Sequence, residues 1–182
     1  MDRTPVPFSW RAFFRSLLEL SDGPWRWRVG LEAGVAVAIP LLLFTLAGHQ
    51  DIGLIAPLGT FTVIYFAASE RRTRIRALVP VAVGLTGCAA IGVVMAANIW
   101  LTLLALIGVT VVACLLILGY QVGPPGPMMP VLVTGVSGHL AAPAALGGAG
   151  VQPGIVVAMV AVGAVSSLLV VAAPLAWRAL AG

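Results

Sequence analysis

The sequence feature that most constrains the fold is a cluster of arginines between two long apolar runs. Residues 69–76 read Ser-Glu-Arg-Arg-Thr-Arg-Ile-Arg and hold four of the ten basic residues of this 182-residue chain. An arginine at the centre of a membrane helix costs about 2.5–3.5 kcal/mol on insertion scales. We therefore expect residues 69–76 to form a loop outside the hydrocarbon. Short arginine-rich loops stay on the cytoplasmic side of a membrane, which fixes the orientation of the neighbouring runs.

The composition indicates that lipid, rather than water, surrounds the folded chain. Hydrophobic residues make up 60% of the sequence and charged residues 9%, whereas a typical soluble domain is about 25% charged. A soluble globule of this size has too much surface to hide so many apolar side chains. The formal net charge of +4 would suit nucleic acid in a soluble protein, but no base-reading module is visible. We expect the lipid bilayer, and no nucleic acid, as a partner.

The first 24 residues predict a short tail followed by a helix that lies on the membrane surface. Trp10, Phe13 and Leu17 follow the spacing of one apolar helix face, and Arg11 and Arg15 lie on the other face. Such an amphipathic helix lies in the headgroup layer with its arginines toward the phosphates. We expect this interfacial helix to precede the membrane domain.

Residues 25–182 predict one domain of six transmembrane helices. The expected spans are residues 29–47, 52–68, 77–97, 101–120, 128–140 and 155–177. The ten arginines lie in the N-terminal segment, in residues 69–76 and at Arg178, whereas the connections near residues 50, 99 and 147 carry none. By the positive-inside rule, both termini are cytoplasmic. The sequence thus predicts an all-α integral membrane protein, multi-pass in the plasma membrane.

Small residues recur at a spacing that lets helices approach closely in lipid. One row places Gly84, Cys88, Gly92 and Ala96 four residues apart, and further pairs are Gly30 with Gly34 and Gly163 with Ser167. Packing without a hydrophobic driving force depends on such close approach, so these rows are candidate helix–helix contacts. The abundance of Gly and Ala in the whole chain is the simpler alternative.

No enzyme motif is visible in the sequence. The chain lacks G-x-S-x-G, H-E-x-x-H, a Walker A loop and C-x-x-C. It has two histidines and six acidic residues in all. We expect a protein that is not an enzyme, with no catalytic residues, no metal site and no cofactor.

Two titratable residues in the spans are candidates for proton coupling. Glu32 lies one turn into the first span, where a carboxylate needs a partner or a cavity. It is either a proton-coupling acid or the partner of Arg28, four residues earlier. His139 lies late in the fifth span; it relays protons or binds substrate, or else it is an interfacial histidine wetted from outside. Hydroxyl groups in the spans are expected to bond carbonyls of their own helices: Thr60, Thr62, Thr134 and Ser137.

The stretch Gln-Val-Gly-Pro-Pro-Gly-Pro at residues 121–127 cannot be helical, because proline lacks an amide proton and glycine lacks stiffness. It is either an ordinary cytoplasmic connector or the broken part of a transport site, since discontinuous helices often build such sites. The helix that starts after Pro127 points free amides toward the loop, which suits an anion. Candidate substrate-binding residues are Gln121, Arg71, Arg72 and His139.

The order of these features resembles the membrane half of the fusaric-acid-resistance-protein-like (FUSC) family, which includes aromatic acid exporters. Residues 47–60 read Ala-Gly-His-Gln-Asp-Ile-Gly-Leu-Ile-Ala-Pro-Leu-Gly-Thr; the arginine cluster, a Gly-rich third helix and residues 121–127 follow. The resemblance covers about residues 25–177. It implies a six-helix unit that exports organic acids, driven by the proton gradient. Larger relatives carry two such units and a cytoplasmic domain, and many have Gly-Thr after the cluster where this chain has Ala77-Leu78.

The resulting functional hypothesis is a transporter subunit, an exporter of small organic anions such as aromatic carboxylic acids. As a half-size unit it would form a homodimer or a higher homo-oligomer. Arg71 and Arg72 would raise the local anion concentration at the cytoplasmic mouth, and Glu32 or His139 would handle protons. The alternative is a non-transporting membrane scaffold or accessory subunit.

Overall fold

The computed structural model describes residues 27–67, 69–120 and 125–180, and in this part of the chain it consists of helices and turns without strands. Its helices are α2 (Trp27–Leu46), α3 (Gln50–Gly53), α4 (Pro57–Thr60), the 3₁₀ helix η1 (Phe61–Ile64), α5 (Arg71–Met95), α6 (Ile99–Gly119), α7 (Met128–Ala141), the 3₁₀ helix η2 (Ala144–Leu146) and α8 (Pro153–Leu180). The interfacial helix expected within the first 24 residues lies outside the described residues.

Helices α2, α5, α6 and α8 are each long and apolar enough to cross a membrane. The shortest of them, α2, has 20 residues and therefore rises about 30 Å, the thickness of the hydrocarbon core. The ends of α2, α6 and α8 lie within three residues of the predicted spans. The two shorter apolar segments, residues 50–64 and α7, occupy the positions of the predicted second and fifth spans.

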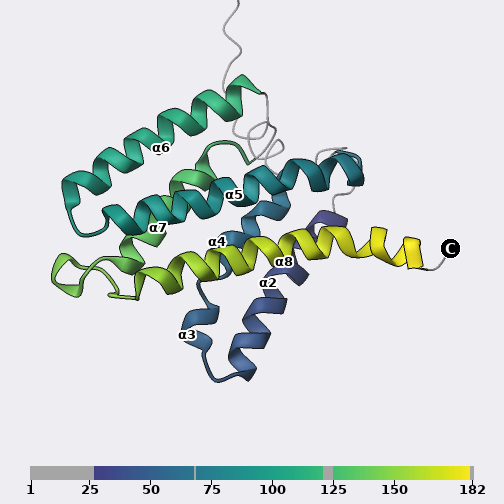
Figure 1. Cartoon of the computed structure of the whole chain (residues 1–182), viewed down its shortest axis with the longest axis horizontal. Helices are drawn as coiled ribbons and strands as arrows, with labels where there is room; N and C mark the ends of the chain where they lie inside the picture. Colours follow the sequence, from purple (N-terminus) through teal and green to yellow (C-terminus); the bar gives the residue numbers. More distant parts are fainter. Residues whose placement is uncertain (1–26, 68, 121–124, 181–182) are drawn as a thin grey trace, which may run out of the picture.

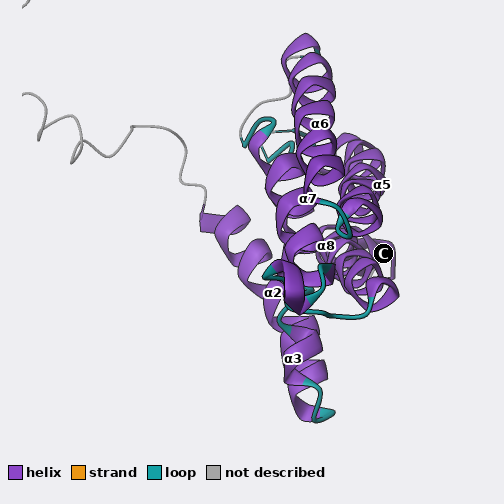
Figure 2. Cartoon of the chain, turned by 90° about the vertical axis from the view of Figure 1, so that its left-hand side faces the viewer, coloured by secondary structure: helices purple, strands orange, loops and turns teal. Residues whose placement is uncertain are grey.

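The helices pack around a central pair, α5 and α8. Figure 1 shows these two running side by side in opposite directions, with α6 on one side and α2 on the other. Helix α7 packs on α5, and α6 lies outside α7. The second view, turned by 90°, keeps α2 and α6 at opposite sides of the bundle (Figure 2). Fully buried side chains at these contacts form the core: Leu78, Leu85, Val133, Val156, Val160 and Val171.

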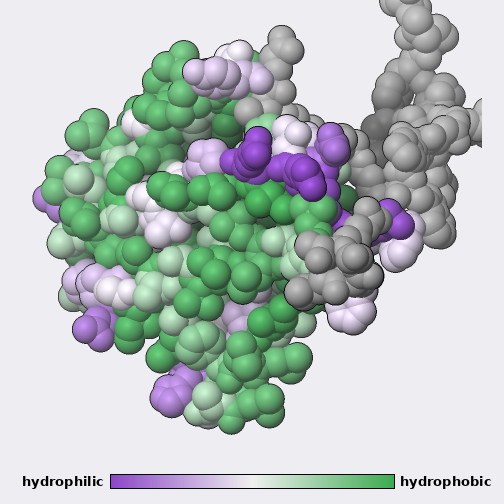
Figure 3. All heavy atoms as spheres, turned by 45° about the vertical axis from the view of Figure 1, so that its right-hand side comes forward, coloured by the Kyte–Doolittle hydropathy of each residue, from purple (hydrophilic) through white to green (hydrophobic). Residues whose placement is uncertain are grey.

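The outward faces of the long helices are apolar. Of the α6 residues only Ala113 is buried, so that nearly the whole helix exposes leucine, isoleucine and valine. Hydrophobic residues cover most of the face drawn in Figure 3; the most hydrophilic ones lie together in its upper part, and others are scattered along the left and lower edges. Water would not solvate such a surface favourably, whereas lipid chains would.

Residues 52–68, predicted as the second transmembrane helix, do not form one continuous helix. This broken segment consists of α3, a turn, α4 and η1, after which Tyr65 is extended and Phe66 adopts a positive φ of 53°. Pro57 cannot donate the amide bond that would continue a helix from the preceding turn, and it therefore begins α4. Hydroxyls of Thr60 and Thr62 bond the carbonyls three residues earlier, at 2.8 Å each.

Two of the predicted small-residue contacts are formed. A Cβ on Gly163 of α8 would collide with the backbone of α4 at Ala56, and a Cβ on Gly92 of α5 would collide with the backbone of α7 at Thr134. By contrast, Gly84 has open space around its Cβ position. The row from Gly84 to Ala96 is therefore in close contact with another helix at Gly92 but not at its first residue.

Gly92→Ala and Gly84→Ala form a matched pair of substitutions within α5. The added methyl group at Gly92 forces α5 and α7 apart, which should lower the free energy of unfolding by about 1–3 kcal/mol. The same change at Gly84 removes a flexible residue from a helix and should leave stability unchanged or raise it by up to about 1 kcal/mol. Thermal unfolding in detergent measures both; equal melting temperatures for the two variants would contradict the close α5–α7 contact.

Candidate functional site

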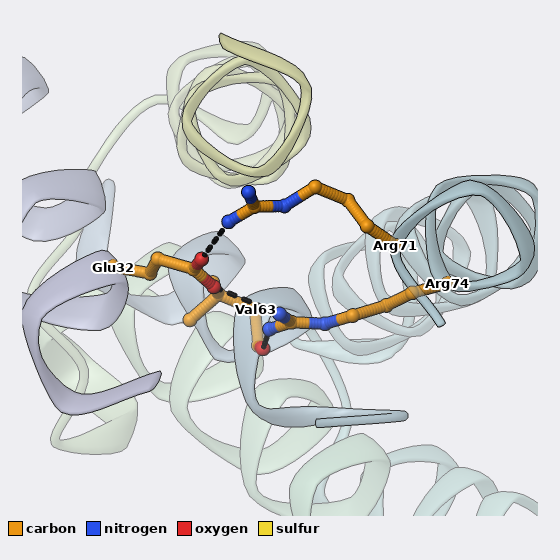
Figure 4. Close-up of polar contacts among 4 residues, drawn as sticks. All are labelled: Glu32, Val63, Arg71 and Arg74. Atoms are coloured by element: carbon orange, nitrogen blue, oxygen red, sulfur yellow. Dashed lines mark hydrogen bonds and ion pairs between the residues drawn. The ribbon is translucent and has the colours of Figure 1, made fainter. Parts of the chain in front are cut away.

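A cluster of three charged side chains joins α2 to the start of α5. Arg71 donates from Nη2 to Glu32 Oε1 at 2.6 Å, and Arg74 donates from Nη1 to Glu32 Oε2 at 2.8 Å (Figure 4). The side chains of Glu32 and Arg74 are 14% and 6% exposed, whereas that of Arg71 is 34% exposed. Two cations meet one anion, so the cluster carries a net charge of +1.

Arg74 also binds the backbone of the broken segment. Its Nη2 donates to the carbonyl oxygen of Val63 at 2.6 Å. In a continuous helix this carbonyl would accept the amide proton of Ala67, but the chain becomes extended at Tyr65. Arg74 therefore satisfies a buried carbonyl that the break in the helix has freed, while holding Glu32 with its other nitrogen.

The expectation that residues 69–76 form a loop is wrong, because α5 already begins at Arg71. Arg71 and Arg74 are three residues apart, so they share one face of the helix and both reach Glu32. Arg72 and Arg76 are exposed. The bonds to Glu32 and Val63 offset much of the free-energy cost of burying the guanidinium of Arg74. The prediction of a loop assumed that this cost keeps every arginine out of the interior.

The pairing of Glu32 with Arg28 within α2 is also not formed. Glu32 has both carboxylate oxygens occupied by arginines of α5. The guanidinium of Arg28 lies instead over the ring of Trp27, 5.9 Å from its centroid, as a cation–π contact in the first turn of α2.

The proline-rich connector meets the broken segment close to this cluster. Tyr65, two residues after Val63, donates from its hydroxyl to the carbonyl oxygen of Gly126 at 2.9 Å. This hydrogen bond connects the end of the connector, directly before α7, to the extended residue that follows η1. Gln121, proposed from the sequence as a substrate residue, lies outside the described residues.

The structure does not bring His139 to this cluster. His139 is exposed in the last turn of α7, eleven residues from the start of that helix and hence about 17 Å along it. The predicted backbone bond of Thr134 is confirmed, since its hydroxyl donates to Pro130 O at 2.8 Å. Ser137 Oγ, in contrast, is buried without a hydrogen-bond partner among the described residues.

Two open grooves lie against α8. One separates the α2–α3 hairpin from the start of α8 and contains Phe44, His49 and Met159. The other runs between α2 and the later part of α8, and Glu32 lies at its edge. Among the described residues, no group of three His, Cys, Asp or Glu side chains is close enough to hold a metal ion.

Sequence reasoning missed the long-range polar contacts, of which two kinds connect α2 to other helices. The first is the bond of Glu32 to the arginines of α5, and the second joins Ser166 Oγ of α8 to the carbonyl oxygen of Ala36, 2.9 Å away in α2. A signal for the first was available: an acidic residue inside a span needs a cation, and residues 69–76 hold four of the ten arginines of the chain. No sequence pattern identifies the second.

The chain is 33% identical over 130 residues to the uncharacterized membrane protein YvaC of Bacillus subtilis (strain 168); the matched part is 70% of this chain and 20% of the relative. The chain is a multi-pass membrane protein. Its four apolar helices of spanning length and its similarity to a membrane protein agree on this point. The chain spans about a fifth of the length of this relative. No family model and no solved structure matches the chain.

Arg74→Met should destabilise the fold far more than Arg72→Met. The first change leaves the buried Val63 carbonyl without its donor and weakens the compensation of Glu32, at a cost of about 3–5 kcal/mol. The second removes an exposed arginine and should change the free energy of unfolding by less than about 0.5 kcal/mol. Reversible unfolding in mixed detergent measures both values. A similar loss in the two variants would show that Arg74 does not hold the broken segment.

Proposed function

We propose that the chain is a membrane transporter subunit, an exporter of small organic anions such as aromatic carboxylic acids. One observation carries this proposal: the broken segment 50–66 and the end of the connector, near Gly126, meet beside a charge cluster with a net positive charge. Irregular backbone at membrane depth persists only where protein buries it or where it lines a water-filled cavity. Interrupted helices of this kind build the substrate sites of many transporters.

Each candidate residue has its own role in this proposal. The partly exposed guanidinium of Arg71 and the exposed Arg72 attract the anion to the mouth by their field. Gln121, in the connector, contacts the anion as it enters. His139 handles protons at the other end of α7, where its ring is exposed. Glu32 shares this proton role only when it releases an arginine, because both its oxygens are occupied.

The same proposal includes the full topology and the assembly. The broken segment 50–66 and α7 serve as short second and fifth spans, both termini face the cytoplasm, and the protein resides in the plasma membrane. The chain belongs in this proposal to the FUSC family, and it forms a homodimer or higher homo-oligomer. The apolar outer faces of α2, α6 and α8 give such an assembly ample surface.

A non-transporting scaffold or accessory subunit is the second candidate. One observation favours it: the two grooves against α8 are lined mostly by apolar side chains, not by a row of polar ones. A scaffold needs only helices that anchor a partner, whereas a transporter needs a polar path when it is open.

Flux of benzoate in proteoliposomes tests the transport proposal. We expect transport that depends on an imposed pH gradient. The double variant Arg71→Gln/Arg72→Gln should slow flux several-fold at low ionic strength and much less at high ionic strength, because salt screens exposed charges. Replacement of His139 by Gln should reduce the dependence on the gradient.

Arg76→Gln is the control for removing a charge one turn further along α5, because this exposed arginine lies four residues after Arg72 on the same face of the helix. Absence of flux for every aromatic acid tested, with the protein folded, would leave the scaffold as the better hypothesis. Equal flux in the double variant and the control would remove Arg71 and Arg72 from the transport route.

Cysteine labelling tests the topology. In a background without Cys88 and Cys114, Ser69→Cys should react with an impermeant maleimide only from the cytoplasmic face, and Asn98→Cys only from outside. Both positions are exposed and lie at opposite ends of α5. Labelling of the two positions from the same face would overturn the six-span arrangement.

A further inference from the structure

The groove between α2 and α8 is apolar and lies open on the outer surface of the bundle. It is lined by Val35 and Ile39 of α2 and by Leu169 and Ala173 of α8, and it encloses about 410 Å³. Volumes of about 300–1,000 Å³ are typical of sites that hold small ligands. The side chains of Val35, Ile39 and Leu169 are 40–63% exposed, so no other part of the described chain fills this groove.

The groove follows the direction of α2. Its α2 residues are spaced by four, from Leu31 through Val35 to Ile39, and so form one stripe along the helix. At a rise of 1.5 Å per residue, this stripe is about 12 Å long. A narrow apolar stripe of this length fits an extended hydrocarbon chain better than it fits a planar aromatic acid.

A cluster with a net positive charge adjoins the groove at Glu32. Glu32 lines the groove, and both its oxygens accept bonds from Arg71 and Arg74, which do not line it. The guanidinium of Arg71 carries five N–H groups, makes one bond to Glu32, and its side chain is 34% exposed. In Figure 4 the Arg71 side chain reaches toward Glu32 along the α8 side of Arg74. A donor with unused N–H groups is therefore bonded directly to the residue at one end of the apolar stripe.

We propose that this groove binds an anionic phospholipid, with one acyl chain along Val35 and Ile39 and the phosphate on Arg71. Both halves of the ligand find a matching surface: hydrocarbon meets the apolar stripe, and the phosphate neutralises the surplus charge of the cluster. A second copy of the chain would cover the stripe but leave the charge of Arg71 uncompensated. A free organic acid would bind Arg71 but leave the stripe bare.

The proposed lipid site has a consequence for the broken segment. The phosphate binds N–H groups of Arg71 that Glu32 does not use, and Arg74 keeps its bonds to Glu32 and Val63. Bound lipid thus adds a contact, through Arg71, between the groove of α2 and α8 and the start of α5. This proposal does not rest on the proposed transport function, because a scaffold would hold such a lipid equally well.

Native mass spectrometry of the protein in neutral detergent tests this proposal. The probes are phosphatidylglycerol and phosphatidylcholine with identical acyl chains. We expect phosphatidylglycerol to bind about tenfold more tightly, because its headgroup carries a net negative charge, whereas the choline ammonium of phosphatidylcholine offsets the charge of its phosphate. Arg71→Gln should abolish this preference. Val35→Phe should fill the stripe and weaken the binding of both lipids.

Two matched controls distinguish the groove from the general lipid-facing surface. Arg76→Gln makes the same change of charge on the same helix, and Val111→Phe makes the same change of size on α6, where Val111 is 52% exposed. Both should bind phosphatidylglycerol as the unchanged protein does. Because preference is a ratio measured on folded protein, a loss of yield in one variant does not obscure it.

Three results would overturn the proposal. The first is equal affinity of the unchanged protein for the two lipids. The second is an effect of Val35→Phe on oligomeric state with no effect on lipid binding, which would assign the groove to a second copy. The third is displacement of phosphatidylglycerol by benzoate, which would make the groove part of the substrate route.

Discussion

The arrangement of the bundle depends on one buried cation. Arg74 lies in the first turn of α5 and bonds both the carboxylate of Glu32 and the carbonyl of Val63. These partners come from α2 and from the broken segment, so a single side chain connects both of these elements to α5. The penalty for burying this charge is offset only while both partners stay in place, and this makes the three elements interdependent.

The remaining contacts are those of helices that pack without a hydrophobic driving force. Where α4 meets α8 and where α5 meets α7, glycines bring backbones into direct contact. Serine hydroxyls of α8 add bonds to carbonyls of other elements: Ser166 to Ala36 and Ser167 to Thr60, at 2.9 and 3.1 Å. Lipid competes poorly for such groups, since it offers neither close packing nor hydrogen-bond partners in its core.

The long helices could be predicted from hydropathy because their length and apolar character are properties of the local sequence. The break within residues 52–68 could not, since the run is as apolar as the others and only Pro57 indicates an interruption. The inclusion of Arg71–Arg76 in the start of α5 and the burial of Arg74 were not anticipated. That burial requires Glu32, 42 residues away, and no local pattern relates the two residues.

The shortness of α7 has a consequence for the membrane around the protein. With 14 residues it rises about 21 Å, which is about 9 Å less than the hydrocarbon thickness. In the proposed topology, where α7 is the fifth span, such hydrophobic mismatch would draw the two leaflets together beside the helix or let water reach its ends. In either case the transmembrane voltage would fall over a shorter distance there than beside the four long helices. The electric field acting on any charge beside α7 would be correspondingly stronger.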